Sequence, residues 1–110
     1  MKNPFELYDK FDNPKQLKVA EEIQRKRLQL LVHSCLYYNM STNLISDKQW
    51  DKIAIELVAL QKRYPKTSEQ VVFAKAFKDF DGNTGYDLPL NNKWVRKKAK
   101  QLQAIENSTL

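Results

Sequence analysis

Residues 37–51, YYNMSTNLISDKQWD, join two helical patterns and set the topology of this 110-residue chain. Within them, Ser46 is followed three residues later by Gln49, a capping box that marks the start of a helix. The residues before them carry apolar side chains at helical spacing, so a first helix is predicted to end here. Because the link of residues 40–45 is short, the two helices are predicted to pack as an antiparallel hairpin.

Both helices of this hairpin have bounds that the sequence predicts. Asn13 is an N-cap residue followed by a proline, so the first helix is predicted to run from there to about Asn39. Its charged segment, residues 25–27, is expected to face solvent. The second helix is predicted to end near Tyr64, before a proline. Its apolar stripe, which must be buried against a neighbour, consists of Trp50, Ile53, Leu57, Leu60 and Tyr64.

Shorter helices are predicted on either side of the hairpin. Asn3 and the proline after it predict a helix through about Phe11. Thr67 and Ser68 predict a cap for a helix that reaches about Phe80. Residues 81–90 are expected to form a loop that holds both glycines. Gly82 is expected in its tight turn and Gly85 at a position of positive φ.

A last helix is predicted over residues 92–105, with Trp94, Val95, Leu102 and Ile105 buried. The helical spacing and the scarcity of glycine together predict an all-α fold rather than a sheet. The chain is therefore expected to form a single domain over residues 1–110, with four to five helices around the central antiparallel hairpin.

Composition and charge exclude some classes of protein. The chain is 42% apolar and 29% charged, which is typical of a globular domain. Its apolar runs are too short to span a bilayer, and the N-terminal residues lack the pattern of a secretory signal. With one cysteine, Cys35, we expect a reduced thiol, a cytoplasmic location and no membrane partner. The net charge of +6 favours acidic partners such as nucleic acid or an acidic protein surface.

One group of aromatic and acidic side chains is predicted to meet in the hairpin. Tyr37 and Tyr38 end the first helix, whereas Asp47 and Asp51 lie four residues apart on one face of the second, beside Trp50. Rings next to carboxylates suit a flat group that is cationic or donates hydrogen bonds. A purely structural reading is also open, in which the aspartates complement the helix dipole and the rings pack the hairpin.

The segment of about residues 28–65 resembles the small N-terminal helical domain of bacterial NAD-dependent DNA ligases, which recognises the nicotinamide mononucleotide half of NAD. In that family this domain closes over the nucleotidyltransferase domain during enzyme adenylation. The resemblance implies nicotinamide mononucleotide or NAD as a ligand. The residues that it implies as cofactor-binding contacts are Tyr37, Tyr38, Asp47, Trp50 and Asp51. Trp50 departs from the family, which usually has Tyr there, and Ser41 and Asn43 stand where Asp and Pro are common.

The catalytic lysine of such ligases belongs to a Lys-x-Asp-Gly motif. The nearest string here is residues 78–82, in which Lys78 stands one residue too far from the Asp-Gly pair. No lysine takes the catalytic position, so the sequence predicts no catalytic residues and no enzyme activity. The predicted binding residues are expected to hold a ligand without catalysing a reaction.

Over its whole length, the chain also looks like short ligase-related proteins of bacteriophages that infect Gram-positive bacteria. The resemblance rests on residues 3–8, residues 45–47 and the loop of residues 79–85. It implies a phage origin, the host cytoplasm as location and a host protein as partner. The main hypothesis is therefore a small non-catalytic binding protein that acts on a host protein or on nucleic acid. The alternatives are a stand-alone module for nicotinamide nucleotides and an antagonist of a host defence nuclease such as Cas9.

Two further groups of residues are candidate sites. Basic residues on the last helix recur at helical spacing, which predicts a positive stripe for nucleic acid or an acidic partner, or an ordinary solvated face. The stripe consists of Lys93, Arg96, Lys97 and Lys100. Read as a calcium loop from Asp79, residues 79–90 lack the required glycine and the final glutamate, and His33 has no second histidine beside it. No metal site is predicted.

Overall fold

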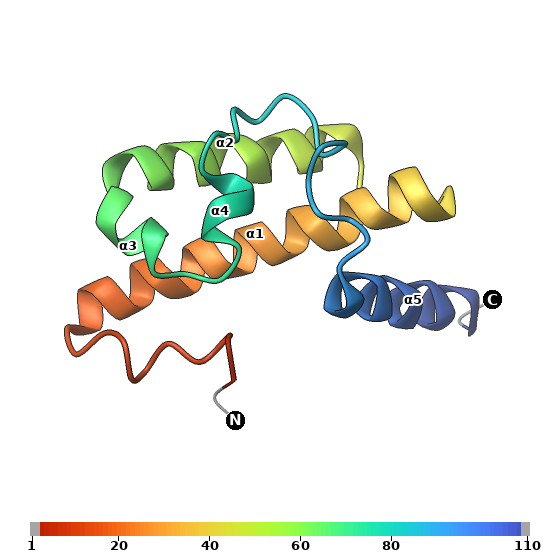
Figure 1. Ribbon diagram of the computed structural model, residues 1–110. Coiled ribbons are helices and arrows are strands. Elements are labelled where there is room, and N and C mark those ends of the chain that lie inside the picture. The colour runs from red at the N-terminus through yellow and green to blue at the C-terminus, as the bar shows by residue number, and fades with distance from the viewer. Residues whose placement is uncertain (1–2, 109–110) are drawn as a thin grey trace.

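A computed structural model describes residues 3–108, and these form five α-helices and no strand. The ends of the predicted domain, residues 1–2 and 109–110, lie outside the described part. The helices are α1 (Pro14–Met40), α2 (Asp47–Arg63), α3 (Pro65–Glu69), α4 (Ala74–Phe77) and α5 (Lys93–Ser108). Figure 1 shows α1 in the middle, with α2 along one side and α5 against its C-terminal half. The prediction of an all-α domain is confirmed.

The central hairpin forms where the sequence predicts it. The Asn13 side chain accepts hydrogen bonds from the backbone N–H groups of Lys15 and Gln16, which starts α1. Ser41, at φ 50, takes the left-handed conformation that ends it. Both bonds of the capping box at the start of α2 are present, and α2 runs back along α1 (Figure 1). The antiparallel hairpin is thus set by signals local to its ends.

The charged segment of α1 departs from expectation. Arg25 is exposed, but Lys26 is 9% exposed and Arg27 only 1%. The Arg27 guanidinium donates to the Gln61 side chain and to three backbone carbonyl groups of the chain after α2. Desolvation by burial lowers the pKa of Arg27 to about 10. The guanidinium therefore organises a folded interior rather than a solvated face.

The same arginine accounts for a second difference. A single helix was predicted from residues 67–68 to about Phe80, but the structure has two short helices, α3 and α4, with Phe73 at φ 65 between them. The carbonyl oxygens of Ser68, Val71 and Val72 accept hydrogen bonds from Arg27 at 3.1, 3.0 and 3.1 Å. The Ser68 oxygen also accepts from the Val71 N–H, but Arg27 draws the Val71 and Val72 carbonyls toward α1 at the point where the helix breaks.

The predicted N-terminal helix is also wrong. Residues 4–5 and 8–10 form turns, and Leu7 and Phe11 next to them are buried in the core. At the other end, the Asn92 side chain caps α5 by accepting from the N–H groups of Trp94 and Val95. The predicted burial of Ile105 is wrong, because 59% of it is exposed. No helix within residues 3–108 is long and apolar enough to cross a membrane.

Candidate functional site

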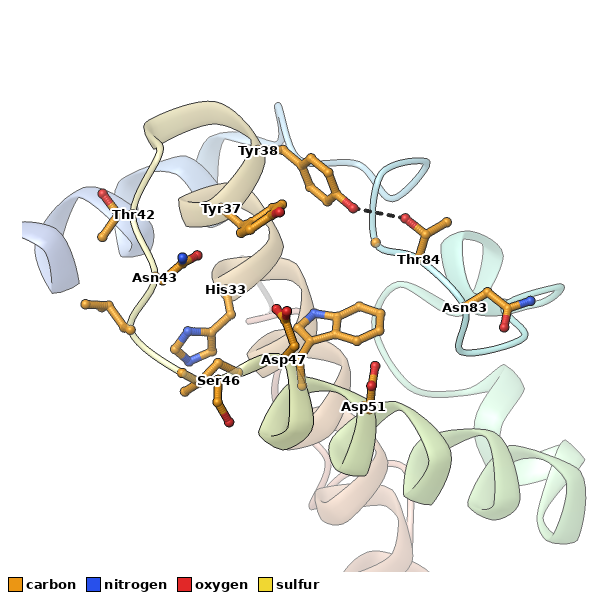
Figure 2. Close-up of a pocket in the computed structure, with 14 residues that line it drawn as sticks. His33, Tyr37, Tyr38, Thr42, Asn43, Ser46, Asp47, Asp51, Asn83 and Thr84 are labelled. Atoms are coloured by element: carbon orange, nitrogen blue, oxygen red, sulfur yellow. Dashed lines mark hydrogen bonds between the residues drawn. The ribbon is translucent and has the colours of Figure 1, made fainter.

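A cavity of about 300 Å³ lies at the end of the hairpin where the link joins α1 to α2 (Figure 2). We call it the hairpin cavity. It is lined by His33, Tyr37, Tyr38, residues 42–47, Trp50, Asp51 and residues 83–85. All of the contacts that the sequence predicts for a nicotinamide nucleotide, Tyr37, Tyr38, Asp47, Trp50 and Asp51, are in this lining. The structure therefore brings the tyrosine pair and the aspartate pair to one space.

The aromatic side of the hairpin cavity is built by the last turns of α1. The rings of Tyr37 and Tyr38 meet edge to face, with centroids 4.9 Å apart and planes at 86°. Tyr37 is 51% exposed and Tyr38 is 41% exposed, so their surfaces are open to a ligand. Trp50 adds a half-buried wall, whose indole N–H donates to Ser34 Oγ at 3.1 Å. Since that bond anchors Trp50 to α1, this residue fixes the shape of the cavity.

The acidic side comes from the first turns of α2. Asp47 and Asp51 are four residues apart, which places both carboxylates on one face of the helix. Figure 2 shows them on the side of α2 where Tyr37 and Tyr38 lie. Within residues 3–108, neither carboxylate has a hydrogen-bond or ion-pair partner from the protein. Both are therefore free to accept hydrogen bonds from a ligand.

The third wall is a loop that sequence reasoning did not assign to the site. The Tyr38 hydroxyl and Thr84 Oγ1 share a hydrogen bond of 3.1 Å, drawn as the dashed line in Figure 2. Thr84 Oγ1 also accepts from the backbone N–H of Tyr86 at 3.2 Å. The Tyr86 ring, in turn, contacts the Tyr38 ring edge to face with centroids 5.4 Å apart. The loop is thus attached to the aromatic side of the cavity.

Gly85 lets this loop approach so closely. A Cβ atom there would overlap the Ser34 hydroxyl and lie 2.8 Å from Ser34 Cβ and 3.2 Å from Trp50 Cζ2. The expected positive φ is found at Gly82, with φ +87, and not at Gly85. The gathering of both glycines in one loop was the available signal. Its cause is contact with α1 and α2, which cannot be read from a local pattern.

His33 lines the hairpin cavity next to these residues. It is half-buried, and its Nδ1 atom is buried with no hydrogen-bond partner in the described part of the chain. Desolvation lowers the pKa of His33 below its ordinary value of 6.5, so the ring is neutral at physiological pH. The cavity therefore gains no positive charge from its histidine.

The basic stripe lies elsewhere. Its residues are all exposed on α5, and none of them lines the hairpin cavity.

The described part of the chain holds no group of three or more His, Cys, Asp or Glu residues suited to a metal ion. Cys35 is buried, and burial raises the pKa of its thiol. The fold and the site thus define a small helical domain with one aromatic and acidic cavity and a separate basic face.

The sequence is similar to segments of DNA ligases. It is 37% identical over 49 residues to the DNA ligase of Thermosipho africanus, 36% over 55 residues to that of Petrotoga mobilis and 33% over 48 residues to that of Methylococcus capsulatus. These alignments cover 44%, 50% and 44% of this chain, but only 7%, 8% and 7% of the respective ligases. No family model and no solved structure matches the chain. The similarity supports a ligase-related domain that corresponds to a small part of those enzymes.

Proposed function

We propose that this ligase-related domain binds the nicotinamide mononucleotide part of a nicotinamide nucleotide in the hairpin cavity. The observation that carries the proposal is the convergence of Tyr37, Tyr38, Asp47 and Asp51 on one open space of about 300 Å³. The oxidised nicotinamide ring is flat and cationic, which suits tyrosine faces. Its carboxamide and ribose present hydrogen-bond donors, which suit carboxylates that only accept.

The state of the aspartates favours binding over a structural role. Asp47 lies in the first turn of α2, where a negative charge stabilises the helix dipole without a ligand. Asp51 lies beyond the first turn, and the dipole effect falls off within that turn. Asp51 also has no partner in residues 3–108. A ligand that donates a hydrogen bond to Asp51 would supply the partner that the described part of the protein does not.

The proposed role is binding without catalysis. The hydroxyl groups that line the cavity are those of tyrosine, threonine and serine, and the neighbouring His33 has no carboxylate bonded to its buried Nδ1. An activated nucleophile needs a base held in position by a third group. We infer that the side chains hold the nicotinamide nucleotide and leave its bonds intact.

Replacing Asp51 with Asn is expected to weaken binding of nicotinamide mononucleotide about tenfold, because a hydrogen bond to a charged group contributes about 1.5–3 kcal/mol. Isothermal titration calorimetry measures the change in Kd. Asp12→Asn is the matched control, since Asp12 is exposed and outside the cavity lining. No heat from the unmodified protein at millimolar ligand, or equal affinity in Asp51→Asn, would contradict the proposal.

The basic stripe supports nucleic acid as a second candidate partner. Lys93, Arg96, Lys97 and Lys100 are exposed, and their spacing places them on one side of α5. Cations arranged in this way neutralise phosphates and release counterions. The stripe is separate from the hairpin cavity, so the two proposals are independent.

If the stripe binds DNA, the logarithm of the affinity should fall with the logarithm of salt concentration with a slope of about −4, one unit for each cation. Lys97→Glu is expected to weaken binding and to reduce that slope by about 1. Fluorescence anisotropy with a labelled duplex measures both quantities. Lys18→Glu serves as the control, because it makes the same charge change at an exposed position on α1. An affinity for DNA that does not depend on salt, or an equal loss of affinity in both variants, would exclude the stripe as the DNA-binding site.

The phage origin, the cytoplasmic location and the host-protein target stay predictions. Capture of one dominant protein from a host lysate would support the host target, including a defence nuclease such as Cas9. Recovery of DNA alone would favour the basic stripe instead.

A further inference from the structure

The charge of the hairpin cavity is opposite to that of the chain. The protein carries a net charge of +6, yet among residues 3–108 the cavity lining contains Asp47 and Asp51 and no lysine or arginine. His33, in the same lining, is kept neutral by its desolvated surroundings. The charged side chains that the described part of the chain contributes to the cavity walls are therefore negative.

The start of α2 is unfavourable for a phosphate in this cavity. A helix N-terminus attracts anions when its N–H groups are free and its dipole is uncompensated. Here Ser46 Oγ accepts from the Gln49 N–H at 3.1 Å, and the Ser46 N–H donates to Gln49 Oε1 at 2.8 Å. Asp47 places a carboxylate in the same turn. A phosphate brought to this helix end would meet a negative side chain.

The aromatic side offers π faces more than hydrogen-bond donors. The hydroxyl of Tyr38 is engaged with Thr84 Oγ1, and the indole N–H of Trp50 is engaged with Ser34 Oγ. Tyr37 retains a half-exposed ring next to Tyr38. Ring faces attract cations through the negative potential above them. Both sides of the cavity thus favour a positive charge.

We infer that the hairpin cavity selects the positive charge of an N-substituted pyridinium ring and does not recognise a phosphate on the ligand. This inference rests on the proposed binding of nicotinamide nucleotides. Nicotinamide riboside, which keeps the cationic ring and has no phosphate, binds at least as tightly as nicotinamide mononucleotide. Dihydronicotinamide riboside, whose ring is neutral, binds about tenfold more weakly than the oxidised riboside.

Calorimetric titration of the full chain with nicotinamide mononucleotide, nicotinamide riboside and dihydronicotinamide riboside at neutral pH tests the order of affinities. The expected order is riboside equal to or tighter than mononucleotide, with the neutral ring weakest. Mononucleotide binding that is tenfold tighter than riboside binding overturns the charge inference and leaves the proposed function intact. Equal binding of the oxidised and reduced ribosides also overturns it. Absence of binding by all three overturns the proposed function, and the inference with it.

The variant Asp51→Asn separates charge from shape, because the amide keeps the size of the carboxylate and removes its charge. Both ribosides lose the hydrogen bond to the carboxylate, but only the oxidised ring also loses the attraction between its positive charge and Asp51, so the preference for the oxidised over the reduced riboside is expected to fall severalfold. The control Asp12→Asn should keep the full preference, because Asp12 lies outside the cavity lining. An unchanged preference in Asp51→Asn contradicts the inference even if the affinity for both ligands falls.

Discussion

Replacing Arg27 with Ala is expected to lower the free energy of unfolding by about 3–5 kcal/mol, a large share of the stability of a small domain. The Arg27 side chain is only 1% exposed, and its guanidinium donates four hydrogen bonds. Its truncation leaves the buried carbonyl oxygens of Ser68 and Val71, and the part-buried one of Val72, without that donor. It also leaves a cavity beside Phe77, whose ring lies 5.7 Å from the guanidinium carbon.

Urea denaturation followed by circular dichroism measures this effect. Arg25→Ala is the matched control, because Arg25 is exposed and so is its ion pair with Glu22 at 3.5 Å. We expect that variant to lose less than about 0.5 kcal/mol. Arg27→Lys keeps the charge but cannot reproduce the planar set of donors, so its loss should be intermediate. Equal midpoints for Arg25→Ala and Arg27→Ala would show that the buried arginine does not organise the interior.

Arg27 also shows which part of the fold cannot be predicted from the sequence. The hairpin could be predicted because its signals are local, namely the Asn13 cap and the capping box of Ser46 and Gln49. The burial of Arg27 could not, since charged residues are seldom buried without a partner and its partners are carbonyl groups 41 to 45 residues away. The break between α3 and α4 follows from those bonds. The local sequence pattern carries no sign of these bonds, so it predicts one continuous helix where the structure has α3 and α4.

The hairpin cavity also has walls that the sequence predicts and one wall that it does not. Its aromatic and acidic sides could be predicted, because Tyr37, Tyr38, Asp47 and Asp51 are fixed by the spacing across one short link. The third wall depends on the contact between Tyr38 and Thr84, which are 46 residues apart. Two glycines in one loop indicate a close approach or a special backbone conformation, but they do not identify the residues that the loop contacts. The role of Gly85 depends on its neighbours on α1 and α2, which no local pattern identifies.

Replacing Gly85 with Ala is expected to be the most damaging change at the site, with a loss of about 3 kcal/mol in the free energy of unfolding. The added Cβ would overlap the Ser34 hydroxyl, and Ser34 is itself buried and bonded to Trp50. Neither the α1 backbone nor the indole can yield without breaking that bond. The loop is therefore expected to move away, which takes Thr84 from the Tyr38 hydroxyl and opens one side of the cavity.

Two readouts follow that displacement. Thermal denaturation reports the loss of stability, and titration with nicotinamide mononucleotide at a temperature where the variant is folded reports the loss of the wall, expected as a Kd raised at least about tenfold. Gly82→Ala is the control, because its Cβ would meet Val58 and Ala54 at ordinary distances of 3.5 and 3.8 Å. Its φ of +87 still makes alanine strained there, by about 1–2 kcal/mol, but Gly82 does not line the cavity. Full affinity in Gly85→Ala would mean that the loop is not a wall of the binding site. An equal loss of affinity in Gly82→Ala would mean that the close approach at Gly85 is not what holds the wall in place.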